Sequence, residues 1–233
     1  MFEEHLEVLQ EIFNRMRQNG LFLKPKKCTF ANHKIKLLGY IVNQEGICTD
    51  PSKIKAIRSF PKPTNKTEVR SFMGLANYYG HFIPNFASKA EQINKTLRKT
   101  NEPFEFPKQA KNAFKRIKQS LTEAPCLRHP DFDKEFSLHT DACATGLGAI
   151  LSQRNEEGQE IVISYASRAM IGNEKNYGAT NLELLAVVWA TEHFKQYLLG
   201  KRFLLNTDHS ALKMLLKSDE ISGMQARWVM KIQ

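Results

Sequence analysis

Apolar residues recur at helical spacing through most of the first half of the chain, and prolines and short polar turns separate the stretches. Five such stretches predict helices, because apolar residues three and four positions apart share one face. The residues on these faces are Leu6, Leu9, Ile12, Phe13 and Met16, then Ile54 and Ile57, then Val69, Phe72, Met73, Ala76 and Tyr79, then Ala90, Ile93 and Leu97, and finally Ala113, Phe114, Ile117 and Leu121.

Two β-like runs interrupt the helices between the first and second stretch. They cover Cys28–Ala31 and Ile35–Val42, and the polar turn Asn43–Gly46 follows the second run. Polar residues also mark where helices begin. Asp50 before Pro51 predicts a capped helix start, and Asn65 with Glu68 has the spacing of a capping box.

The pattern changes near residue 130. Three runs that alternate or stay apolar predict successive strands, and a long apolar helix and a fourth strand follow them. The expected elements are strands Phe136–Asp141, Leu147–Ser152 and Ile161–Ser167, a helix over Asn181–Leu199, strand Phe203–Asp208 and a helix that begins at Ala211–Leu216. Three strands, a helix, a strand and a helix predict an α/β domain whose sheet starts as a meander.

Composition is that of a globular protein, with 42% hydrophobic and 25% charged residues. The longest strictly apolar run, Leu184–Ala190, is far too short to cross a bilayer, and polar residues at positions 3–5 speak against a signal peptide. We therefore expect no membrane segment and a cytoplasmic location. The cysteines have no paired metal-ligand spacing, so we expect reduced thiols at Cys28, Cys48, Cys126 and Cys143.

Charge divides at the same place as the pattern. Residues 1–130 hold 23 Lys+Arg and 11 Asp+Glu, a net charge of +12, whereas residues 131–233 hold 11 and 13, a net charge of −2. One interpretation is a basic half that binds a polyanion and a second half that collects carboxylates. A lysine-rich solvated surface explains the same excess equally well.

Three acids are the candidate chemical residues of the second half. Asp141 ends the first expected strand and Asp208 ends the fourth, while Glu183 lies in the first turn of the long helix beside its apolar face. If the two strands are neighbours under that helix, the three carboxylates meet, and divalent cations such as Mg²⁺ or Mn²⁺ would offset their repulsion. Taken singly, each acid is better explained as a turn, cap or helix-dipole residue.

Several ordered motifs resemble the ribonuclease H domain and the preceding thumb of gypsy-class long-terminal-repeat retrotransposon reverse transcriptases. The ribonuclease H-like motifs are Thr140-Asp141-Ala142, Gly146–Gln153, Ser164–Arg168, Glu183–Ala190 and Thr207-Asp208-His209. The motifs similar to the primer grip and thumb are Lys24–Cys28, Leu38–Val42, Phe60–Thr64, Arg70–Leu75 and Asn77–Phe86. The resemblance covers essentially the whole chain.

The resemblance implies a small β-hairpin with a helical thumb-like subdomain, followed by a mixed sheet with flanking helices. The implied divisions are the end of the polymerase palm and a primer-grip-like hairpin over 1–50, a thumb or connection region over 51–130, and a ribonuclease H-like domain over 131–233. Overall this is an α+β or α/β fold. In the family the sheet continues with a strand and an acid-bearing helix after the position of Gln233, so the domain is expected to be incomplete.

The implied activity is hydrolysis of the RNA strand of an RNA–DNA hybrid, with two Mg²⁺ (or Mn²⁺) ions bound by Asp141, Glu183 and Asp208. The implied partners are an RNA–DNA hybrid or primer–template duplex and the remainder of the Pol polyprotein, in the cytoplasm, a virus-like particle or the nucleus. The resemblance also implies that the hairpin around Leu38, Gly39 and Tyr40 holds the primer end. Lys26 and Lys27 are candidate phosphate contacts, and a solvated turn explains these two residues equally well.

Two features of the resemblance favour other interpretations of this chain. The polymerase aspartates of the family precede everything here, so the chain alone should not polymerise, and the fourth ribonuclease H carboxylate lies after it. The alternative functions are a non-catalytic nucleic-acid-binding remnant and a host-adopted relic. The aromatic residues of Asn77–Phe86 could stack on bases, but their spacing favours core packing.

Overall fold

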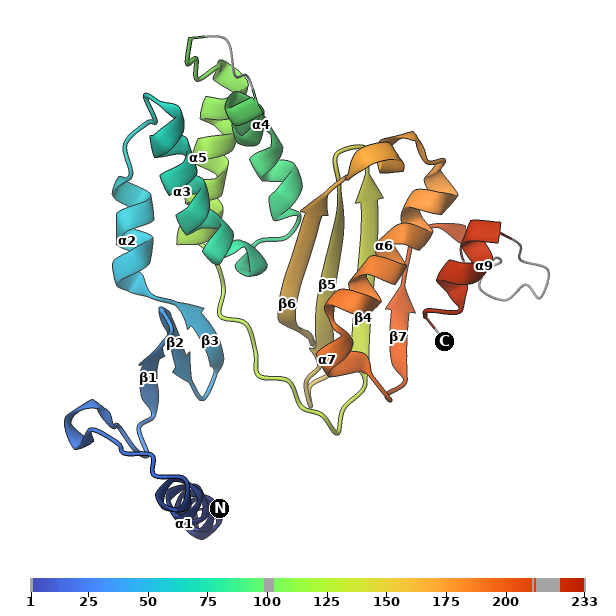
Figure 1. Ribbon diagram of the computed structural model, residues 1–233. Helices are drawn as coiled ribbons and strands as arrows, with labels where there is room; N and C mark the ends of the chain where they lie inside the picture. The colour runs from blue at the N-terminus through green and yellow to red at the C-terminus, as the bar shows by residue number, and fades with distance from the viewer. Residues whose placement is uncertain (1, 99–102, 211, 213–222, 233) are drawn as a thin grey trace. The chain divides into compact units, whose positions relative to one another are not determined.

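The first helix, α1 (Phe2–Gln18), follows the predicted helical spacing of the N-terminal segment. In the computed structural model, which describes residues 2–98, 103–210, 212 and 223–232, residues 1–35 form one unit and residues 36–233 another (Figure 1). The first unit also holds the short helix η1 (Pro25–Lys27). Phe13 packs edge to face on Phe30, with ring centroids 5.8 Å apart, yet no side chain of α1 is buried.

A three-stranded sheet follows, in the order β1 (Lys34–Leu37), β2 (Tyr40–Asn43) and β3 (Gly46–Thr49). The expected strand over Cys28–Ala31 is wrong, because η1 precedes it and Ala31 takes a left-handed φ of 52° that ends any extended run. The expected single strand Ile35–Val42 is two strands, since Leu38 and Gly39 both have positive φ and reverse the chain. The turn after Asn43 is confirmed, because Asn43 pairs with Gly46.

The helices that follow begin at the predicted caps. Asp50 accepts a hydrogen bond from the backbone N–H of Ser52 (3.0 Å), and Asn65 accepts one from that of Glu68 (2.9 Å). The helices are α2 (Pro51–Ser59), α3 (Lys66–Tyr78), η2 (Gly80–Phe82), α4 (Phe86–Arg98) and α5 (Lys108–Thr122). Their predicted apolar faces form one core cluster, with Ile57, Val69, Phe72, Ile93 and Ile117 fully buried.

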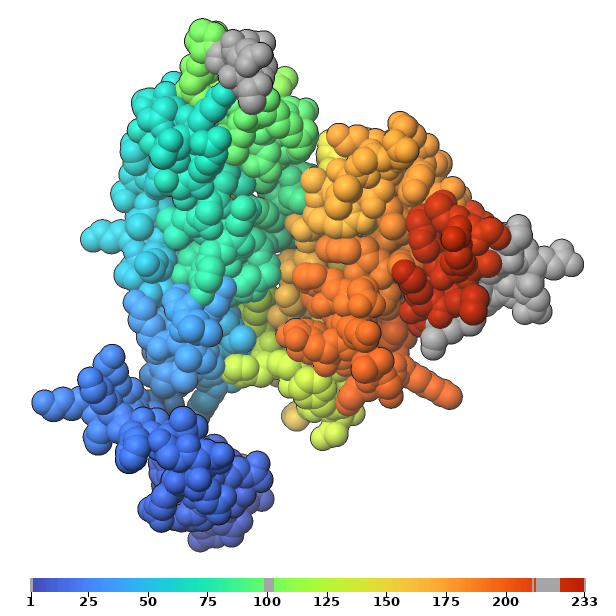
Figure 2. Space-filling model, in the orientation of Figure 1, coloured from blue at the N-terminus to red at the C-terminus, as the bar shows by residue number. Residues whose placement is uncertain are grey.

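A four-stranded mixed sheet occupies the second half, in the order β6-β5-β4-β7. Its elements are β4 (Phe136–Cys143), β5 (Gly146–Arg154), β6 (Glu160–Ala169), η3 (Gly172–Asn176), α6 (Ala179–His193), α7 (Lys195–Leu198), β7 (Phe203–Asn206) and α9 (Gly223–Val229). The meander is confirmed, and β7 runs parallel to β4. Figure 1 shows α6 crossing one face of the sheet, and Figure 2 shows how it hides the strands beneath.

Two predicted helices of this half differ from the structure. The helix expected over Asn181–Leu199 begins earlier, at Ala179, and breaks at Phe194, whose ring is buried in the core beneath α6. The helix expected from Ala211 falls largely outside the described residues. The predicted divisions at residues 50 and 130 stay predictions.

The helical region contacts the sheet through the start of α4. The backbone N–H of Ala87 donates to the Ser167 hydroxyl on β6 (2.9 Å). Asn85 has a positive φ of 52°, and its side-chain oxygen occupies the space that a Cβ atom at position 148 of β5 would need. The absence of a side chain at Gly148 therefore makes the close approach possible.

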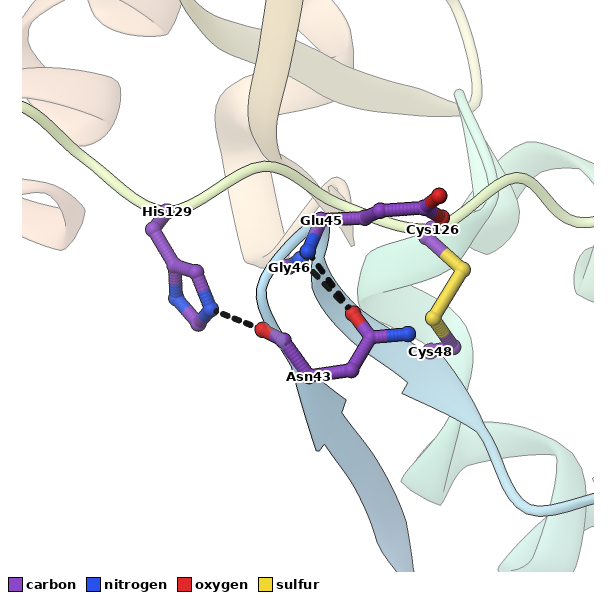
Figure 3. Close-up of a disulfide and its surroundings, with 6 residues drawn as sticks. All are labelled: Asn43, Glu45, Gly46, Cys48, Cys126 and His129. Carbon is purple, nitrogen blue, oxygen red and sulfur yellow. Dashed lines mark hydrogen bonds between the residues drawn. A yellow bond between two sulfur atoms is a disulfide. The ribbon is translucent and has the colours of Figure 1, made fainter. Parts of the chain in front are cut away.

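A disulfide joins Cys48 to Cys126, so the expectation of four reduced thiols is wrong for this pair (Figure 3). The segment after α5 runs beside β3, where Ile47 and Leu127 exchange backbone hydrogen bonds, and this pairing brings the two cysteines together. Cys28 and Cys143 are free thiols. Within the described ranges, no helix has both the length and the apolar character that a bilayer crossing needs.

Candidate ribonuclease active site

The parallel pairing of β4 and β7 brings two of the candidate acids to the same end of the sheet. His139 of β4 pairs with Asn206 of β7, and Asp141 and Asp208 each lie two residues further along. Because the strands run parallel, both aspartates lie at the same end of the sheet, Asp141 within β4 and Asp208 just after β7. Both line one open cavity of about 380 Å³, and both side chains are exposed.

Glu183, the third candidate acid, lies on α6, which packs against β4. Because the helix starts at Ala179, Glu183 lies in its second turn and not in the first as expected. Burial raises the pKa of the Glu183 carboxyl, and the negative charges of Asp141 and Asp208 raise it further. The backbone N–H of Ala142 donates to the carboxylate and lowers the pKa in part. The pKa of Glu183 thus responds to both aspartates, which themselves share one cavity at the end of the β4–β7 pair.

One oxygen of this neighbourhood lacks a partner. Oε2 of Glu183 is buried and makes no hydrogen bond, which is unfavourable for a carboxylate. Hard oxygen ligands with an unsatisfied member match what a divalent cation such as Mg²⁺ requires. Among the described residues, however, no three His, Cys, Asp or Glu side chains already form a group that could hold a metal ion. The carboxylate oxygens are suitable ligands for a divalent cation, but the described side chains are not already arranged around a metal position.

A polar network beside this site was missed by sequence reasoning. Oε1 of Glu160 accepts hydrogen bonds from Ser152 and His139, each at 2.5 Å. The Ser152 hydroxyl, followed by His139, lowers the pKa of the Glu160 carboxyl. Alternation places His139 on the face opposite the buried core, but only the strand register reveals that Glu160 and Ser152 lie beside it. His139 is therefore a strand residue whose side chain has a hydrogen-bond partner of its own.

The turn between β1 and β2 holds three of the predicted nucleic-acid-binding residues. The hydroxyl of Tyr79 donates to the carbonyl of Gly39 (2.6 Å), and that of Tyr78 donates to the carbonyl of Leu38. Tyr40 stacks on Tyr78 with ring centroids 4.9 Å apart. Burial, followed by the hydrogen bond with Tyr78, raises the pKa of Tyr40. These contacts hold the turn while the side chain of Leu38 stays 80% exposed.

The aromatic residues that follow α3 are mostly core residues. Tyr79, Phe82 and Phe86 are buried, as their spacing predicted, whereas Tyr78 is 42% exposed. Burial, followed by the charge of Asp50, raises the pKa of Tyr79. The two remaining candidate residues, Lys26 and Lys27, belong to the other unit, where both are exposed on η1.

Comparison with known proteins adds the family. Residues 106–205 match the RNase H-like domain found in reverse transcriptase. The chain is 39% identical over 98% of its length to the retrovirus-related Pol polyprotein from transposon 297 of Drosophila melanogaster, and 35% identical over 97% to that from transposon gypsy of the same organism. The chain belongs to the gypsy-type Pol polyprotein family. A more distant relative in this family is the transposon Tf2-3 polyprotein of Schizosaccharomyces pombe, 30% identical over 99% of the chain.

The chain spans 21%, 22% and 18% of the lengths of these three relatives, so it corresponds to about a fifth of a Pol polyprotein. Its fold is that of solved viral enzymes. A foamy viral protease-reverse transcriptase in complex with an RNA/DNA hybrid matches with a TM-score of 0.78 at 20% identity, over 100% of this chain and 32% of that one. The same viral enzyme in complex with double-stranded DNA matches over 49% of its chain, with a TM-score of 0.77 at 19% identity. The expected fold class is thereby confirmed, and the family generally uses divalent metal ions.

Proposed function

We propose that this chain supplies the ribonuclease H centre of a Pol polyprotein and that it cleaves the RNA strand of an RNA–DNA hybrid. The proposal is supported by the cavity that Asp141 and Asp208 share at one end of the β4–β7 pair, and by the raised pKa of the Glu183 carboxyl, to which both aspartates contribute. In the reaction, a water oxygen bonds to phosphorus, the bond from phosphorus to the 3′ oxygen breaks, and that oxygen takes up a proton. The products carry a 3′-hydroxyl and a 5′-phosphate.

The three carboxylates would hold two Mg²⁺ or Mn²⁺ ions. When bound, such ions activate the attacking water and stabilise the leaving oxygen. The chain itself orients the ligands: the backbone N–H of Ala142 fixes one side of Glu183, and the β4–β7 register fixes the spacing of the two aspartates. His209 contacts the hydroxyl of Thr180 at the start of α6 (3.0 Å), which holds the segment after Asp208 against the helix.

The basic half would bind the duplex through its backbone. Residues 1–130 carry a net charge of +12, and phosphate contacts by Lys and Arg do not depend on base sequence. We assign duplex contacts to Lys26 and Lys27 and to the turn Leu38–Tyr40. The partners are then a hybrid or primer–template duplex and the rest of the polyprotein, and the place of action is the cytoplasm, including virus-like particles, or the nucleus.

Cleavage of a hybrid with end-labelled RNA, in Mg²⁺ or Mn²⁺, tests the proposal on the whole chain. We expect the RNA strand to be cut and the variants Asp141→Asn, Glu183→Gln and Asp208→Asn to be inactive. The matched control is Asp133→Asn, an exposed aspartate of the same half outside the site. A wild-type chain that is folded, binds the hybrid and does not cut it in either metal refutes the nuclease proposal.

That result would favour the second candidate function, nucleic-acid binding without catalysis. The observation in its favour is that the described acids do not form a ready metal-binding group. Binding of the same hybrid, which should weaken steeply as salt rises, distinguishes this function from the complete absence of nucleic-acid binding.

A further inference from the structure

A second cavity, of about 450 Å³, lies at the opposite end of β7 from the acids. It is formed by the end of α6, by α7, by the turn that leads into β7 and by residues after α9. Its charged lining consists of four cations and one acid, which are Lys195, Lys201, Arg202, Lys231 and Glu192. The net charge of this lining is +3.

Such a concentration of positive charge is unexpected in this half of the chain. Residues 131–233 carry 11 Lys+Arg against 13 Asp+Glu, yet four of those cations surround one cavity. Like charges repel, so gathering them is unfavourable unless an anion lies among them. The buried side chain of Leu198 forms part of the wall, and an apolar wall strengthens the field of the charges beside it.

Two of the cations have no acidic partner among the residues that the structure describes. Glu192 lies 3.8 Å from Lys195, and the amino group of Lys201 donates to the carbonyl of Phe132. Arg202 and Lys231 form no ion pair with any described residue, and both are exposed. The guanidinium group of Arg202 and the amino group of Lys231 line a basic cavity, and both groups are suited to binding phosphate oxygens.

The position of the cavity suits a polynucleotide. Phe203 lines this cavity, and Asp208 follows it by five positions along the chain, which is about 17 Å at the rise of a strand. At about 3.4 Å per base pair, this distance corresponds to about five base pairs of a duplex. We propose that this basic cavity binds phosphate groups of a nucleic-acid backbone, with Arg202 and Lys231 as the direct contacts.

This inference rests on the proposed hybrid binding, but its test is separate from cleavage. The affinity of the whole chain for a fluorescent RNA–DNA hybrid is measured by anisotropy at several KCl concentrations in EDTA, so that no cutting occurs. The test variant is Arg202→Gln with Lys231→Gln. The matched control is Arg227→Gln with Lys175→Gln, which removes the same charge from exposed positions outside the cavity.

Loss of two phosphate contacts should reduce the slope of log affinity against log salt by about 1.8. If the variant and the wild type bind the hybrid equally at 1 M salt, the variant binds it about 60-fold more weakly at 0.1 M. The control pair should keep the wild-type slope. If the double variant does not fold, Lys195→Gln is measured in its place. This substitution removes a third cation from the same cavity and should also reduce the slope of log affinity against log salt.

Three results would overturn the proposal. The first is a slope for the cavity variants equal to that of the control, and the second is no binding of hybrid by the wild-type chain at any salt. The third is a cavity that binds only free phosphate. In that case inorganic phosphate raises the thermal stability of the wild type but not that of the variant, and the salt slope of hybrid binding is the same for both proteins. Failure of cleavage with the slopes as expected refutes the nuclease proposal and leaves this one intact.

Discussion

Replacing Glu183 by glutamine should make the protein more stable and inactive at the same time. The carboxylate of Glu183 is partly buried, has one oxygen with no hydrogen-bond partner, and faces the charges of Asp141 and Asp208. Glutamine has the same shape, carries no charge, and offers an N–H₂ group that can donate to a neighbouring carboxylate. Its oxygen can still accept the hydrogen bond from Ala142.

The size of the effect follows from the unpaired oxygen. An unsatisfied buried polar atom costs about 1–3 kcal/mol, and the partial exposure of Glu183 places the gain near the lower limit, at about 1 kcal/mol. For a chain of this size, 1 kcal/mol raises the Tm by about 2–4 °C. Thermal unfolding followed by circular dichroism, without divalent metal at pH 7.5, measures this difference.

The pH dependence gives a second readout with a definite sign. Since the folded state raises the pKa of Glu183 above its ordinary value of 4.5, its protonated form favours folding. The wild type therefore loses stability as the pH rises from that ordinary value through the raised one. The Gln variant lacks this loss, so the Tm difference should be small near pH 4 and fully developed at pH 7.5.

Metal should reverse the order of stability. Mg²⁺ at ten times its Kd stabilises a folded protein by about 1.4 kcal/mol, and only the wild type keeps all three carboxylates to bind it. A Gln variant that melts below the wild type in the absence of metal contradicts the convergence of the three acids. A Tm difference that stays constant between pH 4 and pH 7.5 contradicts it equally.

Three further changes test other contacts. Gly46→Ala should destabilise the fold by about 3 kcal/mol in urea unfolding, because its φ is 147° and a Cβ would lie 1.9 Å from a backbone oxygen of the segment after α5. Cys48→Ser with Cys126→Ser should lower stability by up to about 4.5 kcal/mol in the same assay, since the disulfide spans 78 residues. Tyr79→Phe removes the hydrogen bond to the β1–β2 turn and should cost about 1 kcal/mol by thermal unfolding.

Each of these changes has a matched control. Gly158→Ala is made at a positive φ of 79° with nothing within 4 Å, so it should cost only about 1 kcal/mol. Tyr197→Phe removes a hydroxyl for which the described chain offers no hydrogen-bond partner, and little change is expected. The disulfide variant is compared with the wild type under reducing conditions, where the two should unfold alike. Equal losses for Gly46→Ala and Gly158→Ala would contradict the close approach at Gly46.

Local patterns in the sequence predicted most of the elements around the candidate site. The alternation of Phe136–Asp141 gave the correct faces of β4, and Asp50 and Asn65 marked helix starts that the structure confirms. These predictions succeed because backbone spacing and capping depend on neighbouring residues. The placement of Glu183 beside Asp141 and Asp208 needed the β4–β7 pairing as an assumption, which the sequence alone does not supply.

The failures concern contacts between distant residues or uncommon backbone conformations. Cys48 and Cys126 meet only because a segment pairs with β3 across 78 positions, and no spacing rule indicates that pairing. The turn inside Ile35–Val42 places Leu38 in a left-handed conformation that leucine seldom adopts, so a continuous strand was the natural expectation. Hydrogen bonds from Tyr78 and Tyr79 hold the turn, and these arise from residues about 40 positions away.

The parallel pairing of β4 with β7 also sets the order in which the centre is assembled. Residues 144–202 lie between the two strands, so during synthesis the meander and α6 emerge from the ribosome before the strand that leads to Asp208. A growing chain therefore holds Asp141 and Glu183 for some time without the third acid. Contacts between residues far apart in sequence form slowly, because the loop between them must close first. Docking of β7 is thus the step at which a nascent chain would bring Asp208 to the proposed centre.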